Sequence, residues 1–269
     1  MPASTAIYPE PPALSHSVME LGRVFLEMGS SLFLRPAYRL LPQGDGHTVM
    51  TLPGFMGADG STSALRRFLR RQGYQAMPWG LGRNIPDQGM TSMVEALDFR
   101  REMEEVLAGK LEEERARSGG KVSLIGWSLG GLYATGMAHR YPDLVRQVIT
   151  LGTPFGDPRG TSIYAFMERI YEADVVPAQI EEWIEFTFEG ELQVPVTALY
   201  SNSDGFVGAT IARLPEHALM ENIAVMASHI GFPFNPLVQA LIAERLSQPE
   251  DNWHPFDKPA FKPFVHQTA

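Results

Sequence analysis

Ser128 lies at the centre of a Gly-x-Ser-x-Gly pattern, in the segment Gly126-Trp127-Ser128-Leu129-Gly130-Gly131. The residues before it, 121–125, are typical of a buried strand, and residues 129–141 are typical of a helix. A serine at so tight a strand-to-helix corner takes a strained backbone conformation, which lifts its hydroxyl clear of the sheet. Glycines are needed two positions away on both sides, because a Cβ there would collide with the neighbouring strand or helix. The pattern predicts that Ser128 is a nucleophile.

A serine hydroxyl is a weak nucleophile until a neutral base accepts its proton, and histidine is the side chain best suited to that task. We expect His229 to be the base, because it directly follows an apolar stretch, 223–227, that is typical of a last strand. His217 is the alternative. The other histidines precede the serine, lie on the helix after it or belong to the tail: His16, His47, His139, His254 and His266.

A carboxylate completes such a proton relay, because it orients the imidazole and stabilises the imidazolium that forms. Asp204 is the candidate, since it follows the apolar stretch 196–200 and lies between the nucleophile and the base in the chain. Asp before Gly is also a common turn pair, so a purely structural role for Asp204 stays open. Asp157 and Asp174 are weaker alternatives, because they belong to an inserted segment.

Acyl transfer also needs backbone N–H groups aimed at the oxygen on which negative charge develops. The residue after the nucleophile, Leu129, is expected to supply one donor. Phe55 is expected to supply the other from the segment Leu52-Pro53-Gly54-Phe55-Met56-Gly57, with Met56 as the near alternative. We expect Met56, Trp127 and Phe155 to contact the substrate, and we expect neither a metal nor a cofactor.

The elements that must position these residues alternate between strands and helices from residue 47 onward. The expected strands are residues 48–52, 74–78, 121–126, 145–151, 194–200 and 221–227, and the expected helices are 61–72, 90–118, 129–141 and 236–247. This alternation predicts an α/β fold with a mostly parallel sheet flanked by helices. Ligands gather at the carboxyl ends of the strands in such sheets, and every candidate residue lies at or just after such an end.

A segment of about forty residues interrupts this alternation. We expect residues 47–154 and 194–248 to form the α/β core and 155–193 to form a helical cap or lid inserted into it. Apolar residues recur at helical spacing over 163–171 and again over 180–188. These stripes favour ordinary packing against the body, although they could also line an acyl pocket or form a moving lid.

Both ends of the chain lie outside this core. Residues 1–46 form an N-terminal extension with an expected helix over 14–41, whose apolar residues recur at helical spacing: Val18, Leu21, Val24, Phe25, Met28 and Leu32. We favour packing of this helix on the body over peripheral contact with a membrane, because its basic residues are few. The tail, 249–269, is rich in proline and aromatic residues, so we expect it to lie against the domain or a partner chain.

Composition limits the classes of function. The 269 residues are 44% hydrophobic and carry a formal net charge of −9, which argues against nucleic-acid binding. The densest basic cluster, Arg66, Arg67, Arg70 and Arg71, is expected to be the solvated face of a helix. There are no cysteines, which excludes disulfides and thiolate chemistry. Neither a secretory signal nor a membrane-spanning run is evident, so we expect a cytoplasmic protein.

Taken together, these residues resemble the α/β-hydrolase superfamily, and in particular its bacterial lipase and carboxylesterase branch. The resemblance runs from about residue 47 to 247, and further segments carry it: Leu151-Gly152-Thr153-Pro154-Phe155, Ser203-Asp204-Gly205 and Ser228-His229-Ile230-Gly231. Lipases of this kind usually have histidines where this chain has Pro53 and Phe155. Both departures leave the backbone donors intact and weaken the expectation of true triglyceride lipase activity. The segment Trp79-Gly80-Leu81-Gly82-Arg83-Asn84 also resembles one in bacterial members, without an evident chemical role.

The resemblance implies an α/β-hydrolase fold and a serine hydrolase that cleaves carboxylic esters through an acyl-enzyme intermediate. The aromatic content of the expected cap favours a hydrophobic acyl group. The alternatives are an acyltransferase or a thioesterase on the same three residues, and a binding protein that keeps the fold without catalysis. The complete set of Ser128, Asp204 and His229 makes the last alternative the weakest.

Overall fold

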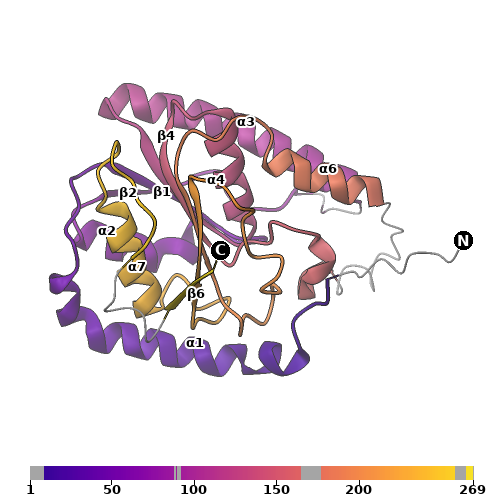
Figure 1. Ribbon diagram of the computed structural model, residues 1–269, viewed down its shortest axis with the longest axis horizontal. Helices are drawn as coiled ribbons and strands as arrows, with labels where there is room; N and C mark the ends of the chain where they lie inside the picture. Colours follow the sequence, from indigo (N-terminus) through magenta and orange to yellow (C-terminus); the bar gives the residue numbers. More distant parts are fainter. Residues whose placement is uncertain (1–8, 88, 90–91, 165–176, 258–264, 269) are drawn as a thin grey trace, which may run out of the picture.

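The computed structural model describes residues 9–87, 89, 92–164, 177–257 and 265–268. A seven-stranded sheet lies in the middle of the molecule, with helices on both of its faces (Figure 1). Its strands are β1 Thr48–Leu52, β2 Gln75–Pro78, β3 Val122–Trp127, β4 Val145–Leu151, β5 Val196–Tyr200, β6 Met220–Val225 and β7 Val265–Thr268. The strand order is β2-β1-β3-β4-β5-β6-β7.

The six predicted strands are confirmed as β1 to β6, and all of their pairings are parallel. The seventh strand comes from the tail. β7 runs antiparallel to β6, with Val265 opposite Val225, so the end of the tail extends the sheet. The side chain of Phe256 is 4% exposed and belongs to the core. The expectation that the tail lies against the domain is therefore confirmed for these residues.

Helices cover the sheet in two layers. One side carries α3 Met93–Ser118, α4 Leu129–Arg140 and α6 Pro177–Thr187. The other side carries α2 Ser63–Arg71 and α7 Pro236–Leu246, with α1 Leu14–Leu34 lying outside α7 (Figure 1). Short 3-10 helices also follow α1 (Arg35–Leu40), precede α2 (Asp59–Thr62) and follow β4 (Pro158–Gly160).

Each face of the sheet has its own hydrophobic core, because successive side chains of a strand point to opposite faces. In β3, Leu124 belongs to the core under α3, α4 and α6, whereas its neighbour Ile125 belongs to the core under α2 and α7. Both side chains are at most 1% exposed. Burial on both faces explains why β3 is rich in apolar residues rather than alternating between apolar and polar ones.

The described part of the inserted segment packs against the body. The Arg100 guanidinium on α3 is fully buried and donates hydrogen bonds to Glu104 Oε1 at 2.9 Å and to Thr187 Oγ1 of α6 at 2.9 Å. Burial lowers the pKa of Arg100 to about 9. Trp183 of α6 is also buried, in the core under α3 and α4. The helix expected over 163–171 falls largely on residues 165–176, outside the described residues, and so does Asp174.

Two expectations about exposure are confirmed only in part. The expected helix over 14–41 is present as α1 and the following 3-10 helix and packs on the body, but of its apolar stripe only Val24 is buried. Polar side chains make its other contacts with the body, so most of its apolar face points outward. In α2, Arg67, Arg70 and Arg71 are exposed as expected, whereas Arg66 is 7% exposed and its guanidinium donates to Thr51 Oγ1 at 3.0 Å.

Candidate active site

Ser128 occupies the corner between β3 and α4 that the sequence predicts. Its φ of 53° and ψ of −122° lie in a region that L-residues rarely adopt, and Ser128 is one of two non-glycine residues with positive φ in the described chain. A Cβ on Gly126 would collide with the backbone of the following helix, and a Cβ on Gly130 would lie 2.6 Å from the Leu52 carbonyl oxygen. The expected need for both glycines is therefore confirmed.

Asp204 and His229 meet at the carboxyl ends of β5 and β6. The imidazole Nδ1 of His229 lies 2.7 Å from Asp204 Oδ2, and the two residues are only 4% and 3% exposed. The other carboxylate oxygen, Oδ1, accepts hydrogen bonds from the N–H groups of Phe206 and Val207 at 2.7 and 2.8 Å. Asp204 therefore shapes its own turn and contacts the imidazole at the same time, so the two roles considered for it are compatible.

The loop after β4 brings this pair next to the Ser128 corner. The Ser128 N–H donates to the Leu151 carbonyl at 2.8 Å. A Cβ on the next residue, Gly152, would lie 3.0 Å from Asp204 Oδ2 and 3.1 Å from His229 Nδ1. Trp127 reaches the loop that carries His229, because its Nε1–H donates to the His229 carbonyl at 3.0 Å. Within the described residues, the Ser128 hydroxyl makes no hydrogen bond to the imidazole.

The loop after β1 lies against Ser128. A Cβ on Gly54 would be 3.1 Å from Ser128 Cβ, so a residue without a side chain allows this approach. The N–H of Met56 donates to the Asn84 carbonyl at 3.0 Å and is thereby occupied. The N–H groups of Phe55 and Leu129, by contrast, have no acceptor in the described part of the chain. This difference favours Phe55 over Met56 as the second donor to an oxyanion.

Asn84 holds the loop after β1 in place. The Asn84 side chain is fully buried, and its Nδ2 donates to the Pro53 carbonyl at 2.8 Å. Its N–H donates to the Gly57 carbonyl at 2.8 Å, and its Oδ1 accepts from the Tyr133 hydroxyl at 2.8 Å. Tyr133 lies on α4, the helix that begins after Ser128. Asn84 therefore connects the loop after β1 to α4, which gives a structural role to the segment Trp79–Asn84.

Glu20 of α1 contacts both loops of the Asp204–His229 pair. Its Oε1 accepts hydrogen bonds from the N–H of Gly205 at 2.8 Å and from the N–H of His229 at 3.0 Å. The residue is 2% exposed. No signal in the sequence indicated this role, because a charged residue on an N-terminal helix is typical of a solvated face.

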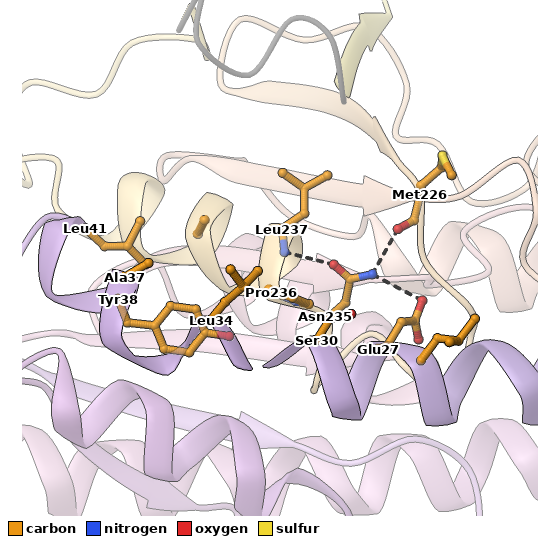
Figure 2. A pocket seen from close by; sticks show the side chains of 12 residues that line it. Glu27, Ser30, Leu34, Ala37, Tyr38, Leu41, Met226, Asn235, Pro236 and Leu237 are labelled. Carbon is orange, nitrogen blue, oxygen red and sulfur yellow. Dashed lines mark hydrogen bonds between the residues drawn. The ribbon is translucent and has the colours of Figure 1, made fainter. Parts of the chain in front are cut away.

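A second α1 carboxylate, Glu27, holds the loop that precedes His229. It accepts from the Ser228 N–H at 2.8 Å and from Asn235 Nδ2 at 3.1 Å. Figure 2 shows Asn235 between Glu27 and Met226, so the start of α7 and the end of β6 are joined here to α1. Burial raises the pKa of the Glu27 carboxyl, while its hydrogen bonds to Ser228 oppose that rise.

The alternative base lies away from this cluster, and the alternative carboxylate is paired with an arginine. His217 is exposed and precedes β6, whereas His229 follows β6, so the two histidines lie at opposite ends of one strand. His139 lies on α4, and its Nδ1 is 3.1 Å from the Gly190 carbonyl oxygen. Asp157 accepts hydrogen bonds from Arg159.

The three expected substrate contacts have different surroundings. Met56 is 54% exposed on the loop after β1, with a φ of 58°. Trp127 is half-buried, and its ring centroid lies 6.0 Å from that of His229. Phe155 is 2% exposed, and its ring lies 6.2 Å from that of Phe188.

Comparison with known proteins agrees with this architecture. Residues 22–266 match the family model described as the alpha/beta hydrolase family. No curated protein sequence matches the chain.

Solved structures with the same fold include three lipases. Aspergillus fumigatus lipase B has a TM-score of 0.55 and 19% identity over 76% of this chain and 53% of its own, so this chain spans about half its length. The mature Bacillus licheniformis lipase BlEst2 has a TM-score of 0.55 and 19% identity, with coverage of 76% and 94%. A Paleococcus ferrophilus monoacylglycerol lipase has a TM-score of 0.52 and 17% identity, with coverage of 77% and 95%. At these identities the likeness shows the fold alone.

Proposed function

The chain belongs to the alpha/beta hydrolase family, and we propose that it is a serine hydrolase that cleaves carboxylic esters with a hydrophobic acyl group. The observation that carries this proposal is the buried 2.7 Å contact between His229 and Asp204 beside the strained Ser128 corner. A carboxylate bound to one imidazole nitrogen leaves the other nitrogen free to accept a proton from a serine.

In the proposed reaction, Ser128 Oγ attacks the ester carbonyl carbon while His229 Nε2 accepts the hydroxyl proton. The N–H groups of Phe55 and Leu129 donate to the oxyanion of the tetrahedral intermediate. As the intermediate collapses, the carbon–oxygen bond to the alcohol breaks, and the imidazolium gives its proton to the departing oxygen. A water molecule, deprotonated by His229, then attacks the acyl carbon. The bond from that carbon to Ser128 Oγ breaks, the acid leaves, and the imidazolium returns its proton to Oγ. Asp204 stays ionised throughout and stabilises the imidazolium.

Apolar groups around the site support a hydrophobic acyl group. Met56 is more than half exposed on the loop after β1, where an acyl chain bound to Ser128 could contact it. The centroid of the Phe206 ring lies 5.2 Å from that of His229. The fold is also shared with the three lipases described above, whose names refer to lipid esters.

A panel of p-nitrophenyl esters of increasing acyl length tests this function in the wild-type chain and in Ser128→Ala. The wild type should turn over these esters, with kcat/KM rising from acetate toward medium-length chains. Ser128→Ala should lose turnover while its circular dichroism spectrum is unchanged. Full turnover in Ser128→Ala would reject the nucleophile. Turnover of thioesters, or transfer to added alcohols, in preference to hydrolysis of these esters would reject the reaction type.

A further inference from the structure

One side of α1 exposes large apolar side chains to solvent. We call this side the outer face of α1 and define it by Leu14, Val18, Leu21, Phe25, Leu26 and Phe33, each of which is at least 65% exposed. At 100° per residue these six positions cover about 140° of the helix circumference. The helix has 21 residues and is therefore about 31 Å long. Contiguous apolar surface of this extent marks an interaction site.

Hydrogen bonds to the body fix which face of α1 points outward. The three charged residues of the helix are Glu20, Arg23 and Glu27, and all of them lie on the side opposite the outer face. Glu20 and Glu27 accept hydrogen bonds from backbone N–H groups of the loops around His229, as described above. The Ser17 hydroxyl donates to the Gly205 carbonyl at 2.7 Å. Rolling the helix to bury its apolar side would break all of these bonds.

A groove beside the helix extends this apolar surface toward α7. It has a volume of about 460 Å³. Residues of α1, of the following 3-10 helix and of the start of α7 line it, together with Met226 (Figure 2). Its apolar lining includes Leu26, Leu34 and Leu237. Met226 is 79% exposed at the end of β6. The apolar surface therefore continues from the helix to the edge of the sheet beside the loop that carries His229.

The exposed charged side chains of α1 and of the following 3-10 helix are positive, although the chain as a whole is acidic. Over residues 14–40 no acidic side chain is exposed, whereas Arg35 and Arg39 are exposed just beyond α1. Glu10 and Asp45 are the exposed acidic residues on either side of this stretch. Arg71 at the end of α2 lies in the same region. Burial raises the pKa of Tyr38, and the charges of Arg35 and Arg71 both oppose that rise. An apolar face bordered by arginines is complementary to lipid tails bordered by anionic headgroups.

We propose that the outer face of α1 docks on the surface of an anionic lipid bilayer, with the helix lying in the plane of the interface. None of the described helices is long and apolar enough to cross a membrane, so this contact is peripheral. A second copy of the chain is the less favoured occupant. A two-fold dimer brings the same surface of both copies together, and neither α1 nor the following 3-10 helix has an exposed acidic side chain to pair with Arg35 and Arg39. The proposal is independent of ester hydrolysis.

Vesicle co-sedimentation of the full chain tests the proposal. The wild type should bind vesicles of phosphatidylcholine with phosphatidylglycerol, and the double variant Phe25→Ser, Phe33→Ser should bind at least tenfold more weakly, because it loses two large apolar groups. The matched control is Val106→Ser, which replaces a 45% exposed apolar residue of α3 and should bind like the wild type. Arg35→Gln with Arg39→Gln should weaken binding to anionic vesicles by about fivefold per arginine and leave binding to pure phosphatidylcholine unchanged.

Two results would overturn the proposal. One is a wild-type chain that stays in the supernatant with anionic vesicles at low ionic strength. The other is a dimer, detected by light scattering without lipid, that Phe25→Ser with Phe33→Ser converts to monomer, since a second copy would then cover the face. Circular dichroism of each variant verifies that it is folded, and no readout depends on catalysis.

Discussion

The backbone of Ser128 keeps its strained conformation because both of its polar groups are bonded to the segment around the end of β4. Its N–H donates to the Leu151 carbonyl, and its carbonyl accepts from Thr153 Oγ1 at 3.0 Å. A non-glycine residue with positive φ costs about 1–3 kcal/mol. The surrounding hydrogen bonds and the two flanking glycines offset that cost, so the hydroxyl is held at the sheet edge before any substrate arrives.

Replacing Asn84 should reduce catalysis without removing a group that touches substrate. Asn84→Ala loses the bonds to the Pro53 carbonyl and to the Tyr133 hydroxyl, so the loop that carries Phe55 becomes less fixed. We expect kcat for a short ester to fall about tenfold, which is less than the 100-fold or greater loss caused by deleting an oxyanion donor. The buried Tyr133 hydroxyl left without its partner should lower the free energy of unfolding by about 1–3 kcal/mol.

Asn252→Ala, at an exposed asparagine, is the matched control for Asn84→Ala and should change neither quantity. An Asn84→Ala chain that is destabilised but has wild-type kcat would show that Asn84 serves only the fold.

The bounds of strands and helices were predictable to within a few residues where the hydrophobic pattern of the sequence determines them. β1 and β4 have the predicted bounds, because each is rich in β-branched and apolar residues and lies between polar turns. The orientation of α1 was not predictable, since periodicity shows that one face is apolar but not which face meets the body. The contacts of Glu20 and Asn84 depend on residues distant in the sequence, so neither role had a local signal. β7 was missed because its partner strand lies about forty residues earlier.

Because α1 holds both loops of the Asp204–His229 pair, a change on this helix should affect the reaction. Glu20→Ala removes the acceptor for the Gly205 and His229 N–H groups and should lower kcat about 10- to 100-fold by displacing the imidazole. Glu20→Gln keeps one acceptor oxygen and should retain more activity than Glu20→Ala. Steady-state kinetics on a short ester, with KM and kcat separated, measures both effects.

Met28→Ala provides the control for Glu20→Ala on the same helix, because Met28 is 41% exposed and makes no such contact. Equal kcat in Glu20→Ala and Met28→Ala would contradict the positioning role of Glu20.

As a whole, the molecule places its candidate site at the carboxyl edge of the sheet, between the two hydrophobic cores, with α1 outside.

Two buried histidines distant from that site make the stability of the fold depend on pH. Burial lowers the pKa of both His47 and His139 below the ordinary value of 6.5. Charging either residue therefore costs more in the folded chain than in the unfolded chain, which binds the proton more readily.

The free energy of unfolding should accordingly fall as the pH decreases from 6.5 toward the lowered pKa values, and should be insensitive to these groups above 6.5. His139→Gln should reduce this slope, because the buried His139 Nε2 has no hydrogen-bond partner in the described residues to favour the charged form. Urea unfolding at pH 5, 6 and 7 measures the effect, with His254→Gln, at an exposed histidine, as the control. An unchanged slope in His139→Gln would contradict this assignment.

The most direct test of the proposed proton relay is labelling with a fluorophosphonate probe, followed by mass spectrometry to locate the adduct. We predict one adduct, on Ser128, that forms rapidly in the wild type and in His217→Ala and is at least 100-fold slower in His229→Ala. An adduct on another residue, or equal rates in His229→Ala and His217→Ala, would contradict it.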